Sequence, residues 1–147
     1  ASARCGYIAA RADWIEGLLD LKTATTFSSS RMAADLIHRI LTDSGYRRHM
    51  EATRLRLAQQ LARTAARLRR LGTQPWLTPA AGMFLWCRLP EGRRAADVAR
   101  ACLEAGVVMA PGDAFSPAAE AGRFLRFNVA QCTDERIFTV LAEALRV

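Results

Sequence analysis

The chain has 147 residues, of which 51% are apolar, and a formal net charge of +7 that comes almost entirely from arginine, since Lys22 is its single lysine. This length and apolar fraction predict a folded domain with a real core and exclude an intrinsically disordered chain. No apolar run is long enough to cross a bilayer and no signal-peptide pattern is present. The basic charge favours a surface of solvated arginines over nucleic-acid binding, because aromatic residues are not interleaved with the basic run.

The first half of the chain reads as helical. We expect a short helix over residues 14–21 capped by Asp13, a polar linker over 23–30 and a second helix over 31–42. The longest periodic segment, residues 46–71, predicts a long helix with apolar residues on one side, closed by Gly72.

The second half changes to a mixed pattern. It predicts strands over 75–78, 83–89, 107–110 and 123–130, and helices over 95–104 and 134–145, the last capped by Thr133. This order indicates an α+β fold: a small, mostly antiparallel sheet with helices on one face and the long helix on its N-terminal side.

The cysteines and histidines point away from disulfides and metals. The four cysteines form no C-x-x-C pair and lie in apolar settings, which predicts reduced, buried thiols in a cytoplasmic protein; they are Cys5, Cys87, Cys102 and Cys132. His38 and His49 lack partners at ligand spacing, so we expect no metal site.

Arg126 is the main candidate binding residue. In a strand, Leu125, Phe127 and Val129 share one face, and Phe124, Arg126 and Asn128 share the other. A guanidinium held on a rigid strand donates two parallel hydrogen bonds to a carboxylate. Two alternatives are an Arg126 paired with a nearby acidic residue, and Arg123 as the binding residue. For Asn128, a hydrogen-bonded residue at the strand end is the preferred interpretation.

The sequence offers a second candidate binding residue and a pair of aromatic residues on one strand. Arg4, near the start of the chain, is a second candidate anion-binding arginine; the alternative is a surface arginine at a frayed terminus. Phe84 and Trp86 share one face of their predicted strand, and packing in the core is the role we expect of them.

Three segments together resemble the C-terminal part of a class I/II pyridoxal-phosphate-dependent aminotransferase. They are residues 2–7 (SARCGY), residues 79–86 (PAAGMFLW), and residues 110–116 (APGDAFS) followed by the Arg126 strand. Within that family the chain is most similar to the MocR group of GntR-type regulators, on residues 45–50 (GYRRHM), 110–112 and 115–116.

The resemblance implies a domain organisation and roles for two residues. Residues 1–45 would be the tail of the cofactor-binding large domain, and residues 46–147 the small domain with the interdomain helix. Arg4 would bind the phosphate of pyridoxal 5′-phosphate, and Arg126 the α-carboxylate of an amino acid or 2-oxo acid. The Schiff-base lysine of the family would precede Arg4, and Lys22 lies too far along the chain to replace it. We therefore expect no catalytic residue in this chain, and no activity from it alone.

The resemblance leaves two functions open for the parent protein. One is a transcriptional regulator of the MocR type, in which this region senses an effector and DNA is bound only by a separate N-terminal domain. The other is a free-standing aminotransferase that transfers an amino group to a 2-oxo acid. Both imply a homodimer with no membrane contact.

Overall fold

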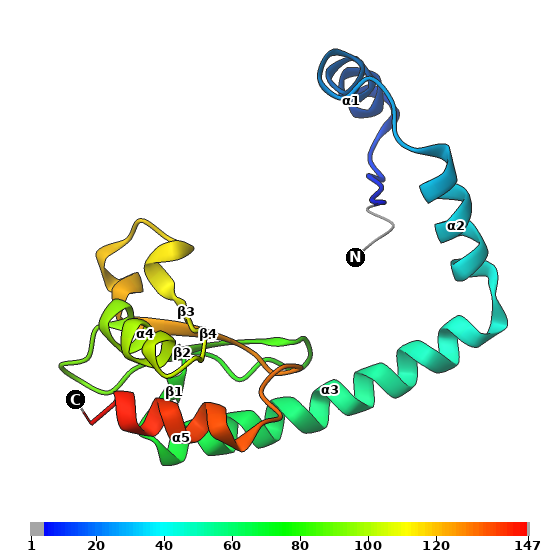
Figure 1. Ribbon diagram of the computed structural model, residues 1–147. Helices are drawn as coiled ribbons and strands as arrows, with labels where there is room; N and C mark the ends of the chain where they lie inside the picture. Colours follow the sequence, from blue (N-terminus) through cyan, green and yellow to red (C-terminus); the bar gives the residue numbers. More distant parts are fainter. Residues whose placement is uncertain (1–4, 147) are drawn as a thin grey trace. The chain divides into compact units, whose positions relative to one another are not determined.

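A computed structural model describes residues 5–146 (Figure 1), and the chain divides into two units, residues 1–50 and 51–147. The first unit contains α1 (Ala12–Thr25) and α2 (Arg31–Thr42), and α3 (Ser44–Arg70) runs from the first unit into the second. Of the helices in the described residues, none is long and apolar enough to span a bilayer.

Helix α1 is longer at both ends than expected. Asp13 is not its cap, because the Asp13 carboxylate pairs with the Arg11 guanidinium at 3.0 Å and lies inside the first turn. At the other end, the hydroxyls of Thr23 and Thr25 donate to backbone carbonyls four residues earlier, so these threonines continue the helix instead of opening the linker. The expected helix over 31–42 is confirmed, with Ser30 as its cap.

The second unit builds a four-stranded sheet in the order β1-β2-β4-β3, with every pair antiparallel. The strands are β1 (Gln74–Pro75), β2 (Phe84–Arg88), β3 (Ala110–Pro111) and β4 (Phe124–Asn128). Helices α4 (Ala95–Glu104) and α5 (Glu135–Ala144) complete it, with two 3₁₀ turns, η1 (Gly112–Ala114) and η2 (Ala119–Arg123). The α+β class with a small antiparallel sheet is confirmed.

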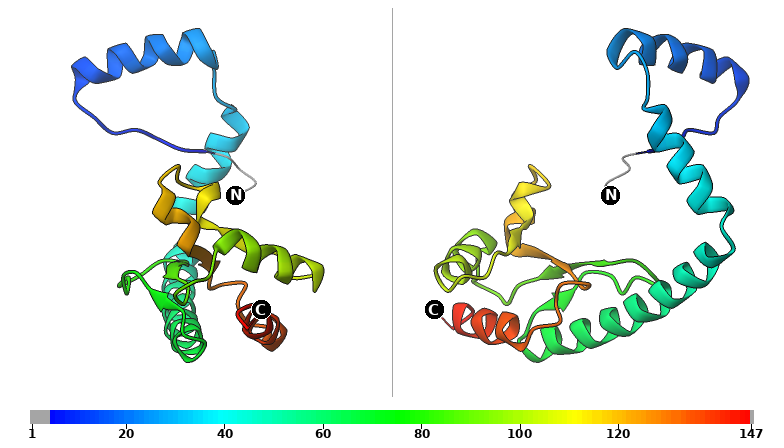
Figure 2. Two further views of the ribbon diagram at one scale, coloured as in Figure 1. Left: turned by 90° about the vertical axis from the view of Figure 1, so that its left-hand side faces the viewer. Right: turned by 45° about the vertical axis from the view of Figure 1, so that its right-hand side comes forward.

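The core lies between one face of the sheet and the three helices of this unit (Figure 2). Leu125 and Phe127 of β4 are buried, as their alternation with Arg126 predicts. They form one apolar cluster with buried side chains of the neighbouring elements, among them Leu85 and Cys87 of β2, Leu68 of α3, Val98 of α4 and Leu141 of α5. Helix α3 ends at Arg70, and Gly72 in the turn that follows has a φ of +77°, which suits glycine. The Thr73 amide donates back to the Leu68 carbonyl.

Three predictions in the second half are wrong in detail. The strand expected over 75–78 is replaced by β1, which covers only Gln74–Pro75. The strand expected over 107–110 is reduced to β3, because the Val107 amide donates to the Cys102 carbonyl in the turn after α4 and Val108 is 82% exposed. Helix α5 is capped by Asp134 and not by Thr133, since the Asp134 carboxylate accepts the Arg136 amide at 2.9 Å.

Three of the four cysteines are buried thiols, but Cys5 is exposed, so its predicted burial is wrong. All described residues before α1 are exposed, so the apolar residues next to Cys5 are not part of a core within residues 5–146. Burial raises the pKa of the Cys87 thiol to about 12, with a smaller contribution from nearby Cys132, and burial raises the pKa of Cys132 itself to about 11.

These thiols predict a loss of stability in alkali. Unfolded cysteines release their protons above their ordinary pKa of 9.0, whereas the folded thiols stay protonated until about pH 11 to 12. The free energy of unfolding should thus fall as pH rises above 9, by up to about 1.4 kcal/mol per pH unit for each buried thiol. Urea denaturation at stepped pH should show a shallower fall in Cys87→Ala and an unchanged one in Cys5→Ala.

Candidate functional site

Arg126 occupies the middle of β4, between two other strands. Its backbone lies opposite Trp86 of β2 on one side and Ala110 of β3 on the other. Its side chain emerges from the face of the sheet opposite to the Leu125 and Phe127 core and is half-buried. A side chain fixed on an inner strand of a sheet has a rigid base, which is what precise recognition of a ligand needs.

The Arg126 guanidinium lies between two phenyl rings. Its central carbon is 3.8 Å from the centre of the Phe115 ring and 4.7 Å from that of Phe84. These cation–π contacts hold the positively charged guanidinium next to the two rings. Among residues 5–146 no carboxylate forms an ion pair with Arg126, so the structure does not support the acidic-partner alternative.

Arg123 has a different environment. Its guanidinium is 3.9 Å from the Glu120 carboxylate, which Arg88 also contacts at 3.4 Å. Arg123 ends η2, outside β4, and it has an acidic neighbour that it shares with Arg88. Of the two arginines, only Arg126 combines an inner-strand position with a charge that the described chain leaves unpaired.

Phe115 reaches Arg126 because the turn at Gly112 packs directly on the sheet. A Cβ atom at Gly112 would lie 2.2 Å from the Ala121 carbonyl oxygen and 2.9 Å from the Trp86 ring. Trp86 in turn stacks on Phe124 at 5.5 Å and meets the edge of Phe115 at 6.2 Å. Only glycine permits this close approach, and the approach sets where the Phe115 ring lies.

The residues around Arg126 differ from expectation in one respect. Phe84 and Trp86 do share a strand face, but it is the Arg126 face, and Phe84 is 45% exposed and not part of the core. Asn128 is the hydrogen-bonded strand-end residue that was expected, since its side-chain oxygen accepts the Ala130 amide at 3.1 Å.

A cavity of about 400 Å³ opens beside Arg126. Its walls are mainly apolar and come from Phe84, the segment 107–110 and Ile137, with Asn128 and Gln131 as polar members. Arg126 is the one charged residue that lines it among the described residues. The arrangement therefore places a single positively charged group at the edge of an apolar hollow.

Arg4 lies outside the described residues, so its role stays a prediction. Within residues 5–146, no group of three or more histidine, cysteine, aspartate or glutamate side chains could hold a metal ion.

Comparison with known proteins places the chain in a family. The family model for aminotransferase class I and II matches residues 1–145. The chain belongs to this family. The resemblance that the sequence motifs indicated is thereby confirmed.

Two curated relatives of this aminotransferase-family chain are HTH-type transcriptional regulators. YdcR of Escherichia coli is 33% identical over 137 residues, and YdfD of Bacillus subtilis is 25% identical over 134 residues. Each match covers 90% of this chain but only 29% and 27% of the relative, so the chain spans less than a third of their length.

Among solved structures, the fold is similar to LysN, an α-aminoadipate aminotransferase from Thermus thermophilus. The TM-score is 0.79 and the identity 25%, over 94% of this chain and 36% of LysN. LysN was solved in complex with N-(5′-phosphopyridoxyl)-L-leucine, in which the cofactor and an amino acid are joined.

The Gly112 turn gives a test of how the site is built. Gly112→Ala should destabilise the protein by about 1–3 kcal/mol, because the new methyl group overlaps backbone and Trp86 atoms that cannot move freely. Gly122→Ala is the matched control, since a Cβ atom there meets nothing within 4 Å. Chemical denaturation measures both. Equal stability of the two variants would show that the turn is not tightly packed.

Proposed function

We propose that this chain is the C-terminal part of an aminotransferase-like protein in which Arg126 binds the α-carboxylate of an amino acid or 2-oxo acid. The observation that carries the proposal is the guanidinium held between Phe84 and Phe115 without a carboxylate partner in the described chain. A guanidinium that is held in position but has no acidic partner is suited to bind a planar anion such as a carboxylate.

The aromatic rings favour carboxylate binding in two ways. They restrict the movement of the guanidinium, so little side-chain freedom is lost when two parallel hydrogen bonds form. They also place apolar ring surface next to the half-buried Arg126 group, and the lower local dielectric strengthens its attraction for an anion. Arg123 instead has an acidic neighbour, Glu120, which it shares with Arg88.

Pyridoxal 5′-phosphate is the cofactor that we assign to the parent protein. The carboxylate receptor at Arg126 fits an amino acid bound next to that cofactor, as the phosphopyridoxyl-leucine of LysN would require. When bound, the cofactor supplies an electron sink for chemistry at the amino acid's α-carbon. This chain would contribute Arg126 to orient the amino acid and Arg4 to hold the cofactor phosphate. Residues 1–45 would then belong to the cofactor-binding domain and 46–147 to the small domain.

The parent protein, as we propose it, is a MocR/GntR-type transcriptional regulator, with this region as its effector-sensing part. Support comes from YdcR and YdfD, both named as HTH-type regulators and both matched over 90% of this chain. Such a protein would be a cytoplasmic homodimer and would contact DNA through a separate N-terminal domain.

The second candidate is a free-standing aminotransferase, which the fold similarity to LysN favours. The residues preceding Ala1 in the full-length protein distinguish the two. A winged-helix module followed by a large domain would identify a regulator, and a large domain alone would identify an enzyme.

Replacing Arg126 with lysine tests the carboxylate assignment in the full-length protein. Arg126→Lys keeps the positive charge but loses the planar fork, and amino acid affinity should fall by roughly tenfold or more, equivalent to about 1.5–3 kcal/mol. The cofactor's absorbance change during an amino acid titration measures this affinity.

Arg123→Lys is the matched control, since it makes the same substitution three residues away on an arginine that already has an acidic partner. Its affinity should stay within about twofold of the wild type, because exposed ion pairs contribute little. Wild-type affinity in Arg126→Lys would refute the assignment, and a larger loss in Arg123→Lys would transfer it to that residue.

A further inference from the structure

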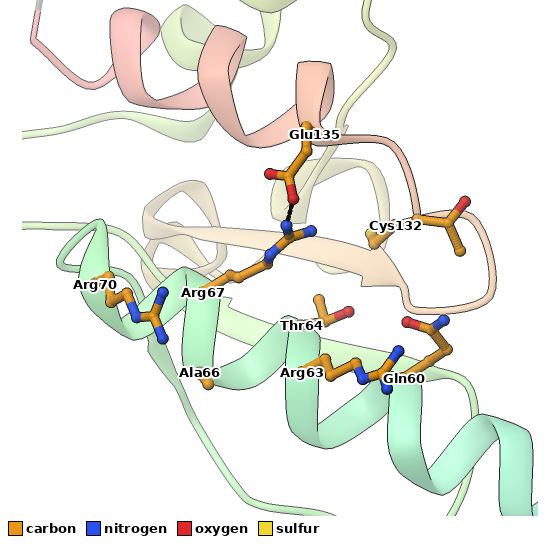
Figure 3. Close-up of a pocket in the computed structure, with 9 residues that line it drawn as sticks. Gln60, Arg63, Thr64, Ala66, Arg67, Arg70, Cys132 and Glu135 are labelled. Atoms are coloured by element: carbon orange, nitrogen blue, oxygen red, sulfur yellow. Dashed lines mark ion pairs between the residues drawn. The ribbon is translucent and has the colours of Figure 1, made fainter.

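A second hollow, which shares only Cys132 with the lining of the Arg126 cavity, lies between α3 and the start of α5 (Figure 3). It has a volume of about 410 Å³, and we call it the α3–α5 groove. Its floor is a row of α3 side chains at helical spacing: Arg63, Arg67 and Arg70. Its other wall is the segment from Cys132 to Glu135. Both walls belong to the helical side of the sheet, whereas Arg126 projects from the opposite face.

The groove carries an excess of positive charge. Glu135 is its single acidic lining residue and forms an ion pair with Arg67, as Figure 3 shows. The Arg67 guanidinium also lies 4.6 Å above the Phe138 ring, which fixes its position. Neither Arg63 nor Arg70 forms an ion pair with any described residue. Two guanidinium charges therefore remain uncompensated at one hollow.

Thr64 adds a buried hydroxyl without a partner to the lining of the groove, and of the three such buried atoms in the described residues it is the one that lies there. It lines the groove and is only 1% exposed, yet its hydroxyl has no hydrogen-bond partner within the described part of the chain. In Figure 3 this hydroxyl points away from the α3 axis, on the side of Gln60 and Cys132. A buried hydroxyl without a partner is unfavourable, and native structures rarely leave one so. An acceptor atom bound in the groove would satisfy it.

The acidic residues at the start of α5 do not oppose an anion strongly. The Asp134 carboxylate is engaged by the Arg136 amide as the helix cap, and Glu135 is neutralised by Arg67. Gln60 and Thr133 add neutral hydrogen-bonding groups to the lining. The donors thus approach from both walls of the groove.

We propose that the α3–α5 groove binds the phosphate group of a small ligand. Arg63 and Arg70 stand on either side of Arg67 along α3, and the Thr64 hydroxyl lies between them in sequence. Donors spread around a hollow suit the several oxygens of a tetrahedral anion better than the single plane of a carboxylate, which Arg126 with its one fork fits. This site does not depend on the function proposed for Arg126.

Titration of the 147-residue chain with inorganic phosphate tests the proposal, with chloride used to keep the ionic strength constant. Backbone amide chemical shifts should change saturably at residues 60–70 and 132–136. The double variant Arg63→Gln with Arg70→Gln should bind phosphate about tenfold more weakly or worse, because two charge-assisted hydrogen bonds are lost. Arg54→Gln with Arg56→Gln is the control: it removes the same charge from exposed positions of α3 outside the groove, and its affinity should stay within about twofold.

Thr64→Val distinguishes a built site from a general attraction of charge. Valine has nearly the shape of threonine but no hydroxyl, so affinity should fall by about threefold to tenfold without loss of the fold. Should this variant fail to fold, the comparison of the two double arginine variants still tests the proposal. Equal loss of phosphate affinity in both double variants, or chemical shift changes that do not saturate, would overturn the proposal. So would binding of a DNA duplex in place of phosphate, with steep salt dependence and equal losses in both pairs.

Discussion

The structure depends on the two-faced character of β4. Burial of Leu125 and Phe127 against the helices fixes the strand by the hydrophobic effect, and the pleat then obliges Phe124, Arg126 and Asn128 to face the other way. Because β4 pairs on both sides, with β2 and with β3, its side chains have little freedom to move as a group. The apolar core thereby sets the direction of a charged group that takes no part in it.

Aromatic contacts, and not an ion pair, hold the Arg126 side chain in position. Trp76, Phe124, Trp86 and Phe115 form a continuous row of ring contacts across the Arg126 face of the sheet. The row ends at the Arg126 guanidinium, whose central carbon lies 3.8 Å from the centre of the Phe115 ring. An acidic neighbour would also offset part of the positive charge, as Glu120 does for Arg88 and Arg123. Rings position a guanidinium without offsetting its charge, which suits the anion-binding role that we propose for Arg126.

Two faces of helix α3 contact two different regions of the protein. Leu61, Ala65 and Leu68 face the core, while Arg63 and Arg70 line the groove beside α5. Thr64 lies where the stripes meet, buried like a core residue but carrying a hydroxyl. Burial of this hydroxyl without a hydrogen bond is unfavourable, and the apolar side chains of the core offer it no acceptor.

The sequence by itself determined what local periodicity encodes. Helix α4 spans Ala95–Glu104 as predicted, Gly72 closes α3, and the alternation along β4 assigned Arg126 to the face opposite the core. Only the tertiary structure decided which groups meet. It brought Phe115 over Arg126, gave Glu120 to Arg123, reduced the strand expected over 107–110, and assembled the groove from α3 and α5. The physical reason is that periodicity depends on neighbours along the chain, whereas pairing of charges and rings depends on how distant segments pack, which no local pattern fixes.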